Sequence, residues 1–132
     1  MTGKVGTLTQ QYRKAVLVVD DDPSMLKGMR RLLTHHGYKA VPFETAKALR
    51  EHCDFDQAFC IVLDVNLSDG SGIDLRHHLA ERGVALPVIY ITGNDSHTTR
   101  MAAMASGCMA YLTKPFTARS LIEPIERAAA IA

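Results

Sequence analysis

The stretch "VLVVDDDPS", Val16 to Ser24, places three consecutive carboxylates directly behind an apolar run. A continuous apolar run of this length is typical of a parallel strand that helices cover on both faces. Adjacent like charges repel each other, so the three acids need a structural use or a neutralising partner. Asp22 has a structural use, because Asp at the N-cap followed by Pro at the first helical position is a common helix start. Asp20 and Asp21 remain as candidates for a site.

Five short apolar runs alternate with helical segments along the chain. The runs are "AVLVV" (15–19), "KAVPF" (39–43), "CIVLDV" (60–65), "LPVIYIT" (86–92) and "CMAYL" (108–112). Alternation of strands and helices predicts an α/β fold built on a parallel sheet. We expect a doubly wound, five-stranded, flavodoxin-like sheet of strand order 2-1-3-4-5.

Three of the intervening segments carry apolar residues at helical spacing. Residues 23–33 form one apolar stripe, and residues 71–80 begin with Ser71 in a pattern that resembles a capping box. Residues 117–130 repeat the spacing of the first segment, but Pro124 interrupts it. Because a proline ring conflicts with the carbonyl four residues earlier, we expect a bend or a late helix start there.

The length indicates a single domain, and the nearly balanced charges indicate no strong net electrostatic potential. The chain has 132 residues, is 47% hydrophobic and carries 15 Lys and Arg against 14 Asp and Glu, for a net charge of +1. We expect one domain over 15–130 after a flexible tail over 1–14, with no direct binding of nucleic acid and no membrane attachment. No apolar run could span a bilayer and the polar start lacks a secretory signal's apolar core, so we expect a cytoplasmic location.

The cysteines and paired histidines do not form a recognisable metal site. Cys53, Cys60 and Cys108 are odd in number and have no C-x-x-C spacing, which argues against a disulfide framework and a structural zinc site. We expect them to be reduced and mostly buried. Adjacent helical residues point about 100° apart, so the histidine pairs at 35–36 and 77–78 cannot each offer two ligands to one ion. We expect solvated residues near helix ends.

The carboxylates after the first and third runs are expected to meet. Asp20 and Asp21 follow the first run, and Asp64 lies near the end of the third. In the expected strand order these strands are neighbours, and ligands bind at their carboxyl ends. A cluster of carboxylate oxygens selects a hard cation, and Mg²⁺ takes one or two carboxylates while accepting a phosphate oxygen. The sequence therefore predicts a Mg²⁺ site suited to phosphate chemistry.

Two further polar residues end the fourth and fifth runs. Thr92 closes "VIYIT", and Lys114 follows "YLT". A hydroxyl, an ammonium and a metal around one carboxylate suit phosphoryl transfer onto that carboxylate, because charge develops on the phosphoryl oxygens. Each residue alone has an ordinary explanation as a turn, cap or strand-end residue. Their joint placement at the ends of different strands favours a site.

With these residues identified, the sequence resembles the receiver domain of two-component response regulators, the chemotaxis-regulator-like fold. The stretches that carry the resemblance are "VLVVDDD", "IVLDVNLSDGSGIDL", "PVIYITG", "SGCMAYLTKPF" and the closing helix. The sequence of these stretches is most similar to receivers of nitrogen-fixation-type transcriptional regulators, which precede a helix-turn-helix domain. No such domain is evident here, and a stand-alone receiver and a part of a longer regulator both stay open.

The resemblance implies a role for each candidate residue. Asp64 would accept a phosphoryl group from a sensor histidine kinase or a phosphotransfer protein. Thr92 would donate its hydroxyl to that group, and Lys114 would pair with it. The Mg²⁺ ligands would be Asp20, Asp21, Asp64 and the backbone carbonyl of Asn66. Apart from its own phosphorylation and dephosphorylation, such a domain catalyses no reaction, so the resemblance implies a signalling domain rather than an enzyme.

The resemblance also implies a switch. Tyr111 matches the aromatic residue that turns inward when the threonine moves, although an aromatic half in the core at a strand edge is the simpler alternative. Phosphorylation would shift the population of the 95–130 face, which then binds a partner or forms a homodimer to control an output such as transcription. The bond between Lys114 and Pro115 is a candidate cis peptide.

Three competing functions fit the sequence less well than a receiver domain. An aspartyl-phosphate phosphatase needs a second acid two residues after the nucleophile, where this chain has Asn66. A pseudo-receiver that acts without phosphorylation would not need the intact set of acids, threonine and lysine. A nucleotide- or flavin-binding domain would need a glycine- or hydroxyl-rich phosphate loop at the position where this chain has three acids.

The loop after Asp64 departs from the pattern of the family that the sequence resembles. It has Leu67-Ser68 where Met-Pro is common in that family.

Overall fold

A five-stranded parallel sheet forms the centre of the molecule. The computed structural model describes residues 14–132, so the expected tail over 1–14 lies, except for Lys14, outside the described residues. The strands are β1 (Ala15–Val19), β2 (Lys39–Phe43), β3 (Ala58–Asp64), β6 (Val88–Thr92) and β7 (Ala110–Thr113). Their order in the sheet is β2-β1-β3-β6-β7, which in chain order is 2-1-3-4-5. The predicted fold class and strand order are confirmed.

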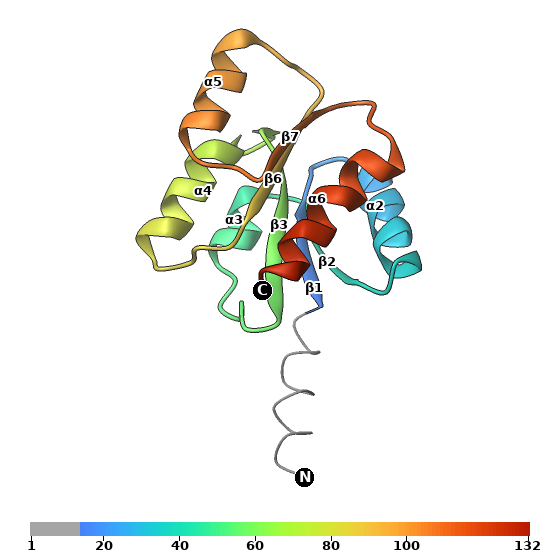
Figure 1. Cartoon of the computed structure of the whole chain (residues 1–132). Helices are drawn as coiled ribbons and strands as arrows, with labels where there is room; N and C mark the ends of the chain where they lie inside the picture. Colours follow the sequence, from blue (N-terminus) through green and yellow to red (C-terminus); the bar gives the residue numbers. More distant parts are fainter. Residues whose placement is uncertain (1–13) are drawn as a thin grey trace.

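The helices cover both faces of the sheet, as the continuous apolar strands require. They are α2 (Pro23–His35), α3 (Ala46–Arg50), α4 (Gly72–Glu81), α5 (His97–Ala105) and α6 (Ala118–Ala130). Figure 1 shows α2 and α6 on one side of the sheet and α3, α4 and α5 on the other. Every residue of β1, β3 and β6 is buried between these two layers. Each layer has its own apolar cluster, so one sheet serves two cores.

Local signals in the sequence locate several element boundaries. Asp22 is the N-cap of α2, its side chain accepts a hydrogen bond from the Ser24 N–H at 2.9 Å, and Pro23 opens the helix. Ser71 caps α4. The strands β1 and β2 span the predicted residues, whereas β3 begins two residues before the expected 60, and β6 and β7 each begin two residues after the expected start. These ends depend on where a neighbouring strand offers partners, which the apolar pattern does not contain.

Of the two alternatives expected for the last helix, a bend or a late start, the late start is wrong. Helix α6 begins at Ala118, with Thr117 as its N-cap, and continues through Pro124. Pro124 is itself buried on the stripe that faces the sheet, together with Leu121, Ile122, Ile125 and Ala128. Burial of such a stripe stabilises the helix enough to offset the roughly 3 kcal/mol that an internal proline costs.

Three smaller features differ from the expectations or extend them. The short helix α3 and a two-stranded hairpin, β4 (Asn66–Leu67) with β5 (Gly70–Ser71), carry too few residues to show a period in the sequence. Cys60 is buried and Cys108 half-buried, but Cys53 is exposed, so the expectation of mostly buried thiols is wrong for Cys53. It lies in the irregular segment that follows α3, where no strand or helix covers it. The Lys114–Pro115 bond is cis, as predicted.

Candidate functional site

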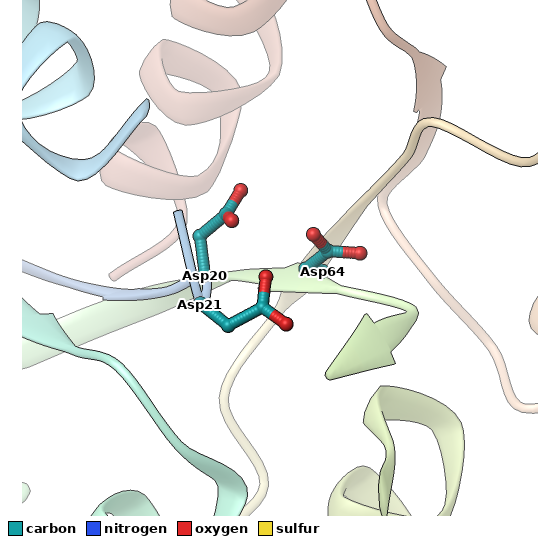
Figure 2. Close-up of side chains that lie close together, drawn as sticks. All are labelled: Asp20, Asp21 and Asp64. Carbon is teal, nitrogen blue, oxygen red and sulfur yellow. The ribbon is translucent and has the colours of Figure 1, made fainter. Parts of the chain in front are cut away.

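Three carboxylates meet where the neighbouring strands β1 and β3 end. Asp20 directly follows β1, Asp64 is the last residue of β3, and Val19 pairs with Leu63 in the register just before them. Figure 2 shows the three side chains gathered at these strand ends. One oxygen of each of Asp20, Asp21 and Asp64 lies within 4.8 Å of the others. The convergence predicted from the sequence is therefore present.

A single lysine joins the two buried carboxylates. Lys114 follows β7, and its Nζ donates to Asp20 Oδ2 at 2.8 Å and to Asp64 Oδ2 at 2.9 Å. The second oxygen of each carboxylate accepts from the backbone, from the Asp22 N–H and the Asn66 N–H respectively, both at 2.9 Å. Both acids are nearly inaccessible to solvent, whereas Asp21 is exposed.

The pKa values at this site are shifted by burial and by the shared lysine. Burial raises the pKa of Asp64, and the hydrogen bonds from Lys114 and the Asn66 N–H offset only part of this effect. For Lys114, burial lowers the pKa, but the hydrogen bonds to Asp20 and Asp64 outweigh it, so the pKa lies above its ordinary value. Lys114 is therefore a charged ammonium at neutral pH. Lys114 supplies one positive charge against the carboxylates of Asp20, Asp64 and the neighbouring Asp21, so the group as a whole favours a cation. With a cation bound to offset the acids, the Lys114 ammonium can pair with a phosphoryl oxygen.

The threonine predicted for the site lies one strand further along the sheet. Thr92 is the last residue of β6 and is buried. Its Oγ1 accepts from the Asn66 side-chain amide at 3.2 Å and from the Asn94 backbone N–H at 3.0 Å. The Lys114 N–H donates to the Thr92 carbonyl oxygen at 2.8 Å, which ties the ends of β6 and β7 together. Thr92 and Asp64 thus share Asn66 as a common neighbour.

A glycine after Asp64 was not singled out from the sequence, although the site depends on it. Gly72 opens α4, and its N–H donates to the Val65 carbonyl oxygen at 2.8 Å. A Cβ placed on Gly72 would overlap the Asp64 carbonyl oxygen. The turn "SDGSG" shows two glycines in the sequence, Gly70 and Gly72. Only the tertiary structure shows that Gly72 is the one packed against the Asp64 backbone.

Tyr111, the predicted switch residue, makes its polar contacts away from the acids. Its hydroxyl donates to Asp95 Oδ1 at 2.8 Å, and the Arg100 guanidinium carbon lies 4.9 Å from its ring centroid. Burial, together with the Asp95 carboxylate, raises the pKa of Tyr111 to about 12. Its ring is half-buried against the core cluster beneath α3, α4 and α5, which agrees with the simpler alternative for this residue as a strand-edge aromatic.

The acidic group is the candidate metal site of the described residues. The oxygen donors of Asp20, Asp21 and Asp64 fit the preference of Mg²⁺ for hard ligands. The histidines at 35–36 and 77–78 are exposed, as expected, and none belongs to a metal-binding group within residues 14–132. The expected place near a helix end is correct for 35–36 and for His78, but wrong for His77, which lies in the middle of α4. None of the described helices is both long and apolar enough to cross a membrane.

Comparison with known proteins matches this chain to response regulators. Residues 16–126 match the sequence model of the response regulator receiver domain. The chain is 32% identical over 123 residues to nodulation protein W of Bradyrhizobium diazoefficiens, covering 93% of this chain and 54% of that protein. It is 30% identical over 113 residues to the transcriptional regulatory protein FixJ of Rhizobium meliloti, covering 86% of this chain and 55% of that protein. The chain spans about half the length of these curated relatives.

Solved structures give the same fold. A crystal structure titled FixJ-N has a TM-score of 0.78 at 29% identity, covering 89% of this chain and 94% of that chain. A CheY-like receiver domain protein from Methanospirillum hungatei JF-1 also has a TM-score of 0.78, at 27% identity and with the same coverage of both chains.

Proposed function

Because this chain belongs to the response regulator receiver domain family, we propose that it is a signalling domain in which Asp64 accepts a phosphoryl group. The observation that carries the proposal is the buried Asp64 carboxylate that shares one ammonium with Asp20. In the transfer, an Asp64 oxygen forms a bond to phosphorus as the bond between phosphorus and the donor breaks. The donor is a sensor histidine kinase or a phosphotransfer protein, which keeps the electron pair of the broken bond.

The neighbouring residues bind and orient the transferred group. Lys114 pairs with a phosphoryl oxygen, and Thr92 turns its hydroxyl from its present neighbours to donate to another. Mg²⁺ would be held by Asp20, Asp21, Asp64 and the backbone carbonyl of Asn66. When bound, Mg²⁺ neutralises negative charge on the phosphoryl oxygens and the carboxylates. These residues promote transfer onto the domain itself and turn over no external metabolite.

Phosphorylation would reach the downstream partner through movement of Thr92 and of the neighbouring strand β7. Movement of the Thr92 hydroxyl removes the acceptor for the Asn66 amide and the Asn94 N–H. Tyr111, on the neighbouring strand β7, turns inward in response and changes the 95–130 face. That face binds a downstream partner or a second copy of the chain, and control of transcription is the output that the name of the relative FixJ favours. We place this activity in the cytoplasm.

Intact mass after incubation with acetyl phosphate tests the proposal. With Mg²⁺, wild type should gain one phosphoryl group, and without Mg²⁺ it should gain none. Asp64→Asn should not gain the group under either condition, because an amide cannot form the acyl phosphate. The exposed Asp56→Asn change, which removes the same charge, should leave the gain intact. Full labelling of Asp64→Asn, or no labelling of wild type, would overturn the acceptor role.

A further inference from the structure

An acidic side chain at the tip of the β4–β5 hairpin reaches a different element of the fold. Asp69 Oδ1 accepts from the Ala46 N–H at 2.8 Å, and Oδ2 accepts from the Lys47 N–H at 3.0 Å. The next free N–H of α3, that of Ala48, is satisfied by Thr45 Oγ1 at 3.0 Å. One carboxylate therefore binds two of the backbone donors that the start of a helix leaves open.

The hairpin lies between two fixed points at the acceptor site. At its start, the Val65 N–H donates to the Ile91 carbonyl oxygen at 2.9 Å, and at its end the Gly72 N–H donates to the Val65 carbonyl oxygen at 2.8 Å. Leu67 is buried in the same apolar cluster as Leu49 of α3. The tip over 68–70 is exposed, and it is Asp69 that binds this tip to α3.

Asn66, the first residue of the hairpin, contacts the acceptor and its neighbour directly. Its backbone N–H donates to Asp64 Oδ1 at 2.9 Å, and its side-chain amide donates to Thr92 Oγ1 at 3.2 Å. Its side chain is otherwise exposed, so its direction depends on how the hairpin is held. A shift of the hairpin relative to α3 would reorient the group that bonds both Asp64 and Thr92.

We propose that Asp69 is a positioning residue for Mg²⁺-dependent phosphoryl acceptance, and that it acts by holding the β4–β5 hairpin against the start of α3. The inference rests on the proposed function of Asp64. Residues 65–71 contain no proline, so this loop lacks the stiffness that a proline would give it. The bidentate contact from Asp69 to α3 restrains the loop through tertiary structure instead.

The charge of Asp69 fits this role. The hydrogen bonds from the Ala46 and Lys47 N–H groups hold the pKa of Asp69 below its usual range. The carboxylate is therefore ionised at neutral pH, where an ionised acceptor forms stronger hydrogen bonds than a neutral one. Asp69→Asn keeps one carbonyl oxygen and can replace one of the two bonds, whereas Asp69→Ala can replace neither.

The test measures the Mg²⁺ concentration that gives half-maximal phosphorylation by acetyl phosphate and, without any phosphoryl donor, the Mg²⁺ dissociation constant by isothermal titration calorimetry. Residues that orient a metal's ligands from outside typically affect its affinity about tenfold or more. We expect a rise of about threefold to tenfold for Asp69→Ala and a smaller rise for Asp69→Asn. The rate at saturating Mg²⁺ should change less, because Asp69 touches neither the acceptor nor the transferred group. A general loss of structure would lower that rate as well.

A change on the opposite side of the contact removes one bond without altering the loop or its charge. Ala46→Pro deletes the Ala46 N–H at the first position of α3, where the backbone tolerates proline, and Thr45 before it is already extended (φ −137°, ψ 156°). Because the Ala46 side chain is buried, the variant is compared only if thermal unfolding shows that the proline ring is accommodated. We expect its Mg²⁺ requirement to resemble that of Asp69→Asn. The matched charge control is Asp56→Asn, an exposed residue before β3, which should behave as wild type. Thermal unfolding monitors folding of every variant.

The outcomes separate this inference from the function on which it rests. An unchanged Mg²⁺ requirement in both Asp69→Ala and Ala46→Pro would overturn the positioning role while leaving Asp64 as acceptor. Equal effects of Asp69→Asn and Asp69→Ala that vanish at high salt would also overturn it, because they would indicate charge acting through space. If wild type is not phosphorylated at all, the proposed function fails first and this inference fails with it.

Discussion

The carboxyl end of the sheet and the α5 side of the molecule are held in contrasting ways. At the sheet end, Asp20 and Asp64 are 0% and 4% exposed and share Lys114. Helix α5 buries a single side chain, that of Ala103, while Met101 and Met104 on the same helix are 57% and 53% exposed. Asp20 and Asp64 thus belong to the core, whereas α5 is attached to its surface.

Polar contacts near its two ends hold α5 in place of apolar burial. At its start, Asp95 accepts from the Tyr111 hydroxyl and from Arg100 Nη2, at 2.8 Å and 2.7 Å. At its end, the Ser106 hydroxyl lies 2.8 Å from the Tyr90 hydroxyl and donates to the Ala103 carbonyl oxygen at 2.7 Å. Each such contact contributes little net stability, so α5 can be displaced at low cost. Separating Lys114 from Asp20 and Asp64 would instead leave buried charges unpaired. This contrast suits a domain that does chemistry at one place and changes shape at another.

This comparison predicts the largest loss of stability for a change at the carboxyl end of the sheet. Gly72→Ala puts a Cβ onto the Asp64 carbonyl oxygen, and relief of the overlap must move backbone. We expect a loss of about 3 kcal/mol of stability. Gly28→Ala, in the middle of α2 where a Cβ meets nothing within 4 Å, should instead stabilise by up to about 1 kcal/mol. Urea unfolding measures both changes, and equal stability of Gly72→Ala and wild type would show that the acceptor end is not rigid.

An intermediate effect is expected at the end of α5. Tyr90→Phe removes the hydrogen bond to Ser106, which costs about 1 kcal/mol, while Ser106 keeps its bond to the Ala103 carbonyl. Amide hydrogen exchange should quicken in the last turn of α5 and stay unchanged in β1 and β3. The matched control is Tyr38→Phe, because the Tyr38 hydroxyl has no hydrogen-bond partner among the residues described. Equal exchange changes in α5 and β3 would contradict the idea of a separately held α5.

The smallest effect on stability is expected at the start of α5. Asp95→Asn should leave stability at neutral pH almost unchanged, because Asp95 and Arg100 are exposed and solvent screens their interaction. It should lower the pKa of Tyr111 from about 12 towards 10, since part of that shift comes from the Asp95 carboxylate. A raised tyrosine pKa contributes stability that is complete below pH 10 and is lost as pH rises through about 12.

Tyrosine ¹³C NMR titration follows Tyr111 directly. In Asp95→Asn, the high-pH loss of stability that comes from Tyr111 should shrink along with the pKa shift. The matched control is Glu123→Gln, which breaks another exposed ion pair, that of Glu123 with Arg127 at 2.6 Å, and should leave the Tyr111 titration unchanged. An unchanged Tyr111 pKa in Asp95→Asn would show that burial alone raises it.

Much of the fold and the identity of the site residues could be predicted from local patterns. The continuous apolar runs at β1 and β3 indicate strands covered on both faces, and Asp22-Pro23 marks the start of α2. Both signals act between residues close in sequence. The doubly wound order then places the ends of β1 and β3 together, so the meeting of their carboxylates follows from topology.

Contacts between distant residues were decided by the tertiary structure alone. The sequence placed Lys114 near the acids, but only the structure shows its ammonium shared between Asp20 and Asp64. Nothing in the local pattern indicates that Asp69 binds the start of α3, more than twenty residues earlier, or that Gly72 must lack a side chain. Periodicity and caps report which residues face inward and where elements begin. Which side chains then meet depends on how the elements pack, and this packing determined the surroundings of Asp64.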